Sequence, residues 1–190
     1  ANDSGFELPT KPVGPILSDK VVMTADWDIA ETINGPRRVV ASPSPKEILD
    51  LDIIQSLIAK NAIVICCGGG GIPVINKDGY YVGVPAVIDK DRLSALLAIE
   101  MQVDALIIST AIDAVRTGFG TESEQTHHTM TVEQAKAHLA SGEFPAGSMG
   151  PKVASAIEVV EILDNVKSII CQPGDAVKAL RGDSGTNFVK

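Results

Sequence analysis

Four consecutive glycines, Gly68 to Gly71, follow a short apolar run at residues 62–67. The run is uninterrupted and rich in β-branched residues, which is typical of a strand buried on both faces. Because glycines have no side chain, a ligand can approach their backbone N–H groups closely. Open α/β sheets bind ligands at this end of their strands. The sequence therefore predicts an anion-binding loop, with a flexible turn as the alternative.

Two lysines stand where helices are expected to begin. Lys90 lies between Asp89 and Asp91, and Lys152 follows the small-residue loop Gly147-Ser148-Met149-Gly150. A helix macrodipole disfavours a cation at the N-terminus, whereas the N–H groups there bind phosphate. Lys152 therefore indicates a nearby anion, and Lys90 could bind a phosphoryl group with Asp91 orienting it. The alternatives are a capping role for Asp91 with Lys90 solvated, and a purely structural Lys152.

Phosphoryl transfer through a loose transition state needs dispersed positive charge and backbone donors rather than covalent help. The two lysines and the glycine loop meet this need. Lys11, in a proline-rich opening arm, is either a third cation of the site or a plain surface lysine. The glycines do not form a P-loop, because no Gly-Lys-Ser/Thr follows them, and Pro73 breaks the dinucleotide fingerprint. The pattern predicts a phosphate-handling α/β enzyme.

The remaining polar residues give weaker evidence about the function. Asp113 and Arg116 follow a predicted buried strand and could line the rim of a pocket. His127 and His128 lie in a polar stretch without metal-ligand spacing, so we expect both to be solvated. No metal site held by protein ligands is predicted, and no Ser-His-Asp set indicates a nucleophilic enzyme.

Composition narrows the class of protein. Of the 190 residues, 45% are hydrophobic and 21% are charged, as in ordinary globular proteins. The net charge of −8 argues against nucleic acid as a partner. The sequence has no apolar run of about 18 residues, so no membrane association is expected. The three cysteines are expected to be reduced thiols of a cytoplasmic protein.

Hydrophobic periodicity predicts helices that alternate with buried strands. The predicted helices lie at about 45–60, 91–101, 131–141, 152–163 and 175–180, and the fourth residue of the third one completes a capping box. The predicted strands lie at 20–24, 37–41, 62–67, 82–88, 103–110, 168–171 and 186–189, with a hairpin turn at Asp78-Gly79. This alternation is typical of an α/β sandwich with a largely parallel sheet.

Four motifs occur in one order and together resemble the carbamate kinases of the amino acid kinase family. They are RRVVASPSPKEI, ICCGGGGIPV, AVIDKD and FPAGSMGPK. The resemblance implies a three-layer α/β/α sandwich of two lobes that forms a homodimer in the cytoplasm. It also implies reversible phosphoryl transfer between ATP and carbamate, giving ADP and carbamoyl phosphate with Mg, often in arginine metabolism.

The resemblance also implies roles for individual residues. Lys90 and Lys152 would bind the transferring phosphoryl group and the ADP phosphates, and Asp91 would hold these lysines in place. Lys11 would reach in from a protruding subdomain, and Gly68–Gly71 would lie near the phosphoryl group. The residues expected to bind the nucleotide are Asp89, Thr110, Asp113, Gly147, Ser148, Met149 and Gly150.

Two departures from the resemblance matter. The opening third of a carbamate kinase, with its two glycine-rich substrate segments, has no counterpart here, so we expect no turnover by this chain alone. Residues 18–37 are also altered, which leaves 1–36 as a remnant of the protruding arm and 37–190 as the kinase domain. The alternatives are a non-catalytic, kinase-like regulatory or scaffolding subunit and another amino acid kinase that acts on a carboxylate.

Overall fold

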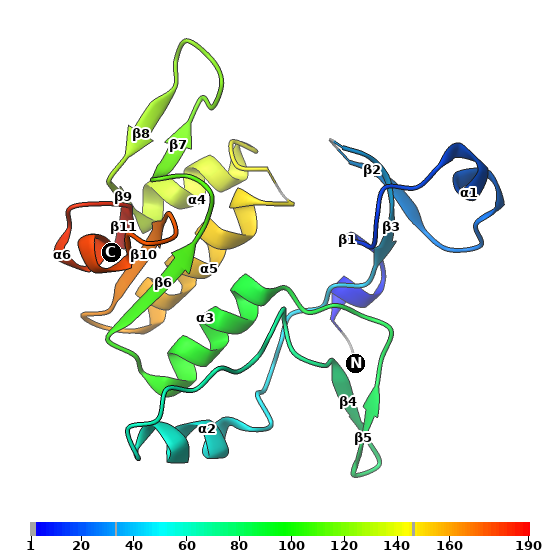
Figure 1. Cartoon of the computed structure of the whole chain (residues 1–190), viewed down its shortest axis with the longest axis horizontal. Helices are drawn as coiled ribbons and strands as arrows, with labels where there is room; N and C mark the ends of the chain where they lie inside the picture. Colours follow the sequence, from blue (N-terminus) through cyan, green and yellow to red (C-terminus); the bar gives the residue numbers. More distant parts are fainter. Residues whose placement is uncertain (1–2, 33, 146) are drawn as a thin grey trace. The chain divides into compact units, whose positions relative to one another are not determined.

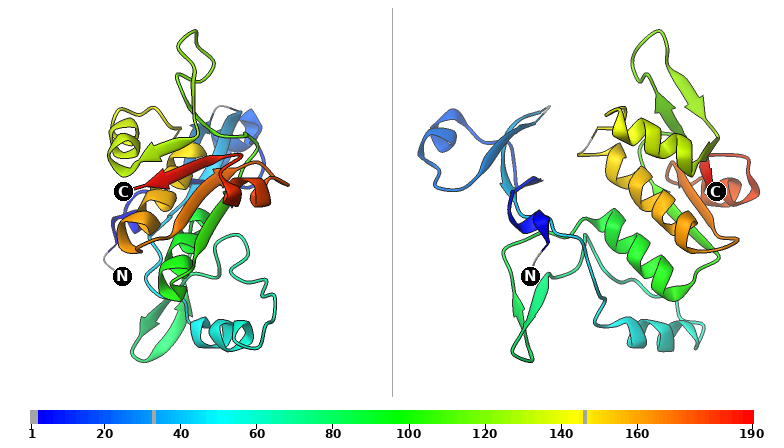
Figure 2. Two further views of the ribbon diagram at one scale, coloured as in Figure 1. Left: turned by 90° about the vertical axis from the view of Figure 1, so that its left-hand side faces the viewer. Right: turned by 180° about the vertical axis from the view of Figure 1, so that it is seen from behind.

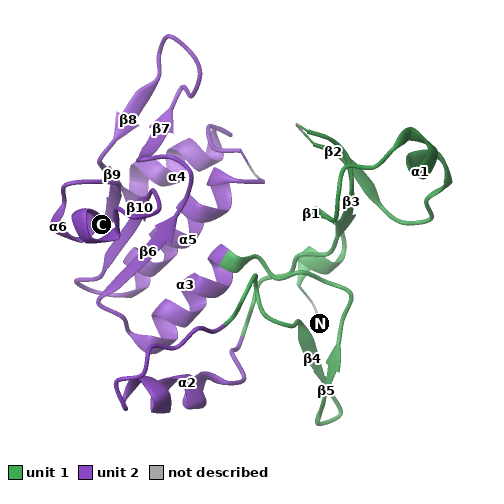
Figure 3. Cartoon of the chain, viewed as in Figure 1, with its two compact units in different colours: residues 1–46, 67–90 green, residues 47–66, 91–190 purple. Residues whose placement is uncertain are grey.

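The computed structural model describes residues 3–32, 34–145 and 147–190, and the order of their elements is shown in Figure 1. The chain divides into two compact units, coloured separately in Figure 3. Unit 1 contains Ala1–Lys46 and Cys67–Lys90, and unit 2 contains Glu47–Cys66 and Asp91–Lys190. The boundary therefore passes between Lys90 and Asp91, within the first turn of a helix.

Unit 1 is built on a small antiparallel sheet with the strand order β1-β3-β2. Its regular elements are the 3-10 helix η1 (Ser4–Phe6), the helix α1 (Asp19–Thr24) and the strands β1 (Lys11–Val13), β2 (Ile29–Thr32), β3 (Gly35–Val40), β4 (Val74–Lys77) and β5 (Tyr80–Gly83). The predicted hairpin is confirmed, because β4 pairs with β5 across Asp78 and Gly79, both with positive φ. Such a turn matches the twist of the flanking strands.

Two predicted strands of unit 1 were wrong in whole or in part. Residues 20–24 belong to the helix α1, because Ser18 provides an extended N-cap and Asp19 supplies a favourable negative charge in the first turn. The predicted strand at 82–88 ends at Gly83, and beyond it Ala86 makes only an isolated bridge to Ala41. Pro85 lacks an N–H group and cannot continue a ladder.

Unit 2 contains a four-stranded sheet in the order β6-β10-β11-β9. The strands are β6 (Ala105–Ser109), β9 (Thr129–Thr131), β10 (Lys167–Cys171) and β11 (Thr186–Val189). The pairs β6/β10 and β9/β11 are parallel and the pair β10/β11 is antiparallel, so the sheet is mixed with mostly parallel pairing. The strand β9 and the hairpin of β7 (Val115–Thr117) and β8 (Gln125–His127) were not predicted.

Helices cover both faces of this sheet, as Figure 2 shows for α4 and α6 on opposite sides of the strands. The α-helices that follow α1 along the chain are α2 (Leu51–Ile58), α3 (Lys90–Met101), α4 (Val132–Ala140), α5 (Met149–Ile162) and α6 (Ala176–Arg181). Ile170 packs with residues of α4 and α5, whereas Ile169 and Cys171 pack with Ala179 of α6. The alternation along β10 therefore gives three layers, and the predicted α/β class is confirmed.

The segment between the predicted first helix and the glycine loop differs most from expectation. The helix α2 begins at Leu51, six residues after the predicted start. Residues 62–66 form no strand with any described part of the chain, so the prediction of a buried strand was wrong. Ile63 and Ile65 are 97% and 98% exposed. The apolar composition was that of a strand, but a strand also needs a neighbour with which to pair.

None of the helices in the described ranges is long and apolar enough to cross a membrane.

Candidate phosphate-binding site

A largely buried ion pair of unit 2 joins Lys152 to Asp91. The Lys152 ammonium donates to both carboxylate oxygens of Asp91 at 3.1 Å, and the two side chains are 11% and 7% exposed. Lys152 lies near the N-terminus of α5, whose first turn has no acidic residue, and Asp91 lies in the first turn of α3. Asp91 is favoured by its own helix dipole and offsets the unfavourable position of Lys152.

The loop that precedes α5 leaves small residues open to solvent. Gly147 and Ser148 are exposed, Met149 is half-buried and Gly150 is buried. The N–H groups of Ser148 and Gly150 both donate to the carbonyl of Pro145, at 3.1 and 3.0 Å. A side chain at Gly150 would come within 3.2 Å of the same carbonyl oxygen. A larger residue at this position would therefore make a tight contact with the loop at the helix start.

Unit 1 contains a second lysine–carboxylate pair, between Lys11 of β1 and Asp89. The Lys11 ammonium donates to Oδ2 of Asp89, whose side chain is 7% exposed, against 27% for Lys11. β1 pairs antiparallel with β3, which fixes the backbone of Lys11. Thus two carboxylates that are two residues apart in the chain each hold a different lysine, one in each unit.

The glycine loop of unit 1 contains one buried glycine among exposed ones. Gly68, Gly70 and Gly71 have positive φ values of 47°, 139° and 75°. A side chain at Gly70 would lie 2.0 Å from the carbonyl oxygen of Ile88, next to Asp89. The N–H groups of Gly70 and Gly71 already donate to the carbonyl of Cys67, at 3.0 and 2.7 Å. The predicted anion-binding loop is therefore limited to Gly68 and Gly69, which are exposed.

Two further predicted residues, Thr110 and Asp113, follow β6 in unit 2. The N–H of Thr110 donates to the carbonyl of Cys171 at 2.9 Å and so extends the β6–β10 pairing. The carboxylate of Asp113 accepts from Arg116 at 2.9 Å, and this hydrogen bond lowers the pKa of Asp113. Arg116 also donates to Glu124 at 2.6 Å, which raises the pKa of the guanidinium. Asp113 thus belongs to an ionic cluster at the base of the β7–β8 hairpin.

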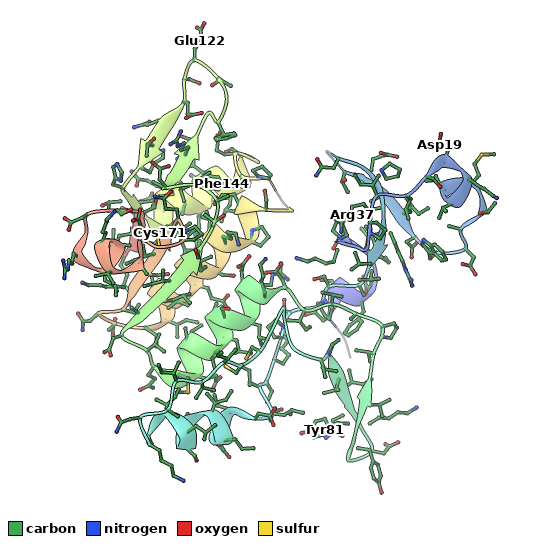
Figure 4. The ribbon with its side chains drawn as sticks, viewed as in Figure 1. Asp19, Arg37, Tyr81, Glu122, Phe144 and Cys171 are labelled. Carbon is green, nitrogen blue, oxygen red and sulfur yellow. The ribbon has the colours of Figure 1, made fainter. Side chains whose placement is uncertain are left out.

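Glu143 is a residue of this region that the sequence did not reveal. Its carboxylate accepts a 2.5 Å hydrogen bond from the N–H of Gly118 and thereby ties the loop before α5 to the end of β7. Phe144, beside it, is buried in the core, whereas Glu122 marks the exposed tip of the hairpin (Figure 4). The sequence signal that could have identified Glu143 is its position directly before the FPAGSMG motif.

The expectation that His127 is solvated was wrong. The Nε2 atom of His127 is 2.8 Å from the Thr117 hydroxyl across the β7–β8 pair, and the ring lies 5.9 Å from that of His138. Burial, followed by the proximity of His138, lowers the pKa of His127. His128 is exposed. In the described ranges no group of three or more His, Cys, Asp and Glu side chains is arranged to hold a metal ion.

The predicted site residues therefore fall into two sets, one in each compact unit. Unit 1 contains Lys11, Gly68–Gly71, Asp89 and Lys90, and unit 2 contains Asp91, Thr110, Asp113, Gly147–Gly150 and Lys152. Each set includes one lysine paired with a buried carboxylate. Each set also includes at least one exposed glycine, Gly147 in unit 2 and Gly68 and Gly69 in unit 1, so each offers groups that can bind phosphate oxygens.

Comparison with known proteins identifies the class of protein. Residues 6–172 match the family model described as the amino acid kinase family, so the chain belongs to that family. It is 41% identical to carbamate kinase 3 of Staphylococcus aureus, covering 98% of this chain and 62% of that protein. It is also 41% identical to the carbamate kinase of Pyrococcus furiosus, covering 99% of this chain and 61% of that protein.

Solved structures agree with these relatives. Carbamate kinase from Giardia lamblia bound to citric acid matches with a TM-score of 0.89 at 36% identity, covering 99% of this chain and 60% of that one. The same kinase bound to AMP-PNP matches with a TM-score of 0.86, over 100% of this chain and 61% of that one. The resemblance and the amino acid kinase fold are thus confirmed, and the chain spans about three-fifths of the length of these relatives.

Proposed function

We propose that this chain is the nucleotide-binding and phosphoryl-binding part of a carbamate kinase. The reaction is reversible phosphoryl transfer between ATP and carbamate, which gives ADP and carbamoyl phosphate. The observation that carries the proposal is the buried pair of Lys152 and Asp91 at two helix N-termini. It occurs in a chain about 40% identical to several carbamate kinases.

In this proposal the lysines neutralise charge on the phosphoryl group as it moves. Lys152 is held by Asp91 with two hydrogen bonds, so its ammonium is positioned before a ligand arrives. Such preorganised charge stabilises a loose transition state without reorganisation during the reaction. Lys90, and Lys11 held by Asp89, supply further positive charge. Gly68 and Gly69, whose backbone is exposed, would bind oxygens of the phosphoryl group or of the second substrate.

The nucleotide is assigned to residues of unit 2 together with Asp89. Gly147, Ser148, Met149 and Gly150 lie at the start of α5, where backbone N–H groups and the helix dipole favour phosphate. Thr110 and Asp113 lie after β6, at the carboxyl end of a parallel strand. Mg would arrive bound mainly to nucleotide phosphates, because the described residues offer no cluster of three protein ligands.

Several properties of the whole enzyme follow as further parts of the proposal. They are the use of ATP or ADP with Mg, carbamate or carbamoyl phosphate as the second substrate, assembly as a homodimer, a cytoplasmic location and a role in arginine breakdown. Since the chain spans about three-fifths of its relatives, turnover is expected only when the remaining part is supplied. A coupled assay of ATP formation from carbamoyl phosphate and ADP, run on this chain alone, should give no signal.

Calorimetric titration with ADP and Mg tests the proposal directly. The unaltered chain should bind ADP, and Lys152→Met should weaken binding by about tenfold or more, since a charge-assisted phosphate contact is lost. Lys136→Met is the matched control, because Lys136 also pairs with a carboxylate from another helix but is half exposed. Thermal unfolding of both variants verifies that they are folded.

A non-catalytic, kinase-like scaffolding subunit is the second candidate. The observation that favours it is the segment 62–66, which pairs with no described strand and exposes Ile63 and Ile65. The fold that carries the proposed phosphate-binding residues therefore has an exposed surface that another protein could cover. An absence of ADP binding at millimolar nucleotide, with Mg present and the chain folded, would overturn the enzyme proposal and leave the scaffold.

A further inference from the structure

Ser155 of α5 carries a buried hydroxyl group that makes no hydrogen bond with the described part of the chain. The residue is 1% exposed, and its Oγ atom has no partner there. Ser168, in the same unit, shows the usual case, since it is completely buried and its hydroxyl donates to the carbonyl of Ala156 at 2.8 Å. A buried polar group without a partner costs free energy, so the Ser155 hydroxyl needs an explanation.

Ser155 lies on the side of α5 that faces α3, and the two helices run side by side (Figure 1). Lys152, Ser155 and Val159 are three and four residues apart, and residues with this spacing lie on one face of a helix. Val159 packs in one core cluster with Ala95 of α3, and Lys152 donates to Asp91 of α3. Ser155 therefore lies between these two contacts. Because helical side chains tilt toward the N-terminus, its hydroxyl is directed toward the end of α5 that carries the ion pair.

The ion pair of Lys152 and Asp91 has the geometry of a shared contact. Both N–O distances are 3.1 Å, whereas a charge-assisted hydrogen bond to a single oxygen is typically about 2.7–2.9 Å long. One ammonium is therefore divided between two carboxylate oxygens, and either oxygen can be released without breaking a short bond. Phosphate oxygens at Lys152 would compete for its three N–H donors. One oxygen of the buried Asp91 carboxylate would then lose a donor, which is costly unless another donor replaces it.

We propose that Ser155 is a positioning residue whose hydroxyl donates to Asp91 when Lys152 binds a phosphate oxygen of a nucleoside diphosphate. Without a ligand, Lys152 occupies both oxygens of Asp91, and the Ser155 hydroxyl is left unpaired. With the ligand, Lys152 keeps one of these oxygens and turns a donor to the phosphate. The Ser155 hydroxyl then takes the other oxygen, so the carboxylate continues to hold the ammonium in place. This inference rests on the proposed function, which supplies the nucleotide.

The variant Ser155→Ala tests the proposal, because stability and ligand binding should not fall together. Removal of an unpaired buried hydroxyl should leave the Tm unchanged or raise it by about 2–4 °C. The affinity for ADP with Mg, measured by calorimetry, should fall about three- to tenfold, since a hydrogen bond of the bound state is lost. Ser168→Ala is the matched control. It removes a paired hydroxyl, so it should lower the Tm by about 2–4 °C and leave the affinity for ADP unchanged.

A double-mutant cycle tests the contact between Ser155 and Asp91 without any nucleotide. In Lys152→Met the Asp91 carboxylate loses both hydrogen bonds from the ammonium, so the Ser155 hydroxyl should donate to it even without a ligand. Ser155→Ala should then lower the Tm by about 2–4 °C in the Lys152→Met background, although it does not lower the Tm of the unaltered chain. Equal Tm shifts in the two backgrounds would overturn the inference.

The outcomes separate this inference from the proposed function. If the unaltered chain and Ser155→Ala bind ADP equally well, the inference is overturned and the nucleotide site stands. If the folded, unaltered chain binds no ADP, the proposed function is overturned, and the Tm shifts of the cycle decide whether Ser155 donates to Asp91. A Tm that Ser155→Ala lowers in the unaltered chain shows that the hydroxyl already has a partner, such as a buried water, and overturns the inference.

Discussion

Residues 63–66 and residues 168–171 have nearly the same sequence, Ile-Val-Ile-Cys and Ser-Ile-Ile-Cys, and lie in the same unit. The second run is the buried centre of a sheet, in β10, where no residue of the four is more than 1% exposed. The first has no strand partner in the described chain, and its two isoleucines are almost fully exposed. Apolar composition therefore gives the capacity to form a buried strand, and neighbouring strands decide whether one forms.

The largest effect expected from this comparison is on stability. Ile170→Ala should lower the free energy of unfolding by about 2–5 kcal/mol, because it leaves a cavity in a fully buried site. Ile65→Ala, the same change in the exposed run, should stay within about 0.5 kcal/mol of the unaltered chain. Urea denaturation followed by circular dichroism measures both, and equal costs would contradict the comparison.

The second test compares a buried ion pair with an exposed one. Lys152→Met should destabilise unit 2 by about 3 kcal/mol, because the Asp91 carboxylate stays buried after losing two hydrogen bonds. Lys136→Met breaks an exposed pair with Glu161 and should cost less than about 1 kcal/mol. The same urea titrations measure the two variants, and a cost near zero for Lys152→Met would contradict the buried pairing.

The third test compares two glycines of one loop. Gly70→Ala should cost more than about 2 kcal/mol, because its side chain would meet the Ile88 carbonyl at 2.0 Å and its φ is 139°. Gly69→Ala faces no atom within 4 Å and should be nearly neutral. Thermal unfolding monitored by the fluorescence of Trp27, which lies in the same unit, distinguishes them. A neutral Gly70→Ala would show that the loop is not held against Ile88.

The smallest effect expected is on pH dependence. Burial lowers the pKa of His127 in the folded chain, so the unfolded chain binds more protons as pH falls below about 6.5. The contribution of His127 to the free energy of unfolding is therefore fully present above about pH 6.5, and it is lost as the pH falls toward the lowered pKa of the folded chain. His138 and Glu143 face the ring and modify this titration.

His127→Asn should therefore flatten the decline of Tm between pH 7 and pH 5. His128→Asn is the control, because His128 is the exposed neighbour. A Tm profile of His127→Asn as steep as that of the control would show that His127 does not contribute.

The sequence predicts those elements whose stabilising contacts are made by residues close to one another in the chain. The capping box of Thr131 and Gln134 and the Asp78-Gly79 turn both formed as expected, since local hydrogen bonds and backbone geometry determine them. The predicted strand at 62–66 is absent because a strand needs a neighbour, and no described strand pairs with this segment. The helix at 19–24 was missed because a short run with two adjacent valines suggested a strand, whereas Asp19 in the first turn favours a helix.

The sequence was enough to predict which residue types form the candidate site, but not which of these residues contact one another. A lysine near the start of α5 indicated an anion, and the structure provides one in the Asp91 carboxylate. Nothing in the sequence pairs Lys11 with Asp89, because the two residues lie 78 positions apart in the chain. The contact of Glu143 with Gly118 is equally invisible, since it joins a loop to a hairpin that was not predicted.

The exposure of Ile63 and Ile65 has a consequence for the life of the chain in a cell. Branched apolar side chains beside unpaired backbone make a polypeptide resemble an incompletely folded one, and chaperones and housekeeping proteases act on such chains. The chain on its own should therefore turn over quickly. Its proteolytic half-life therefore reports how far Ile63 and Ile65 are exposed.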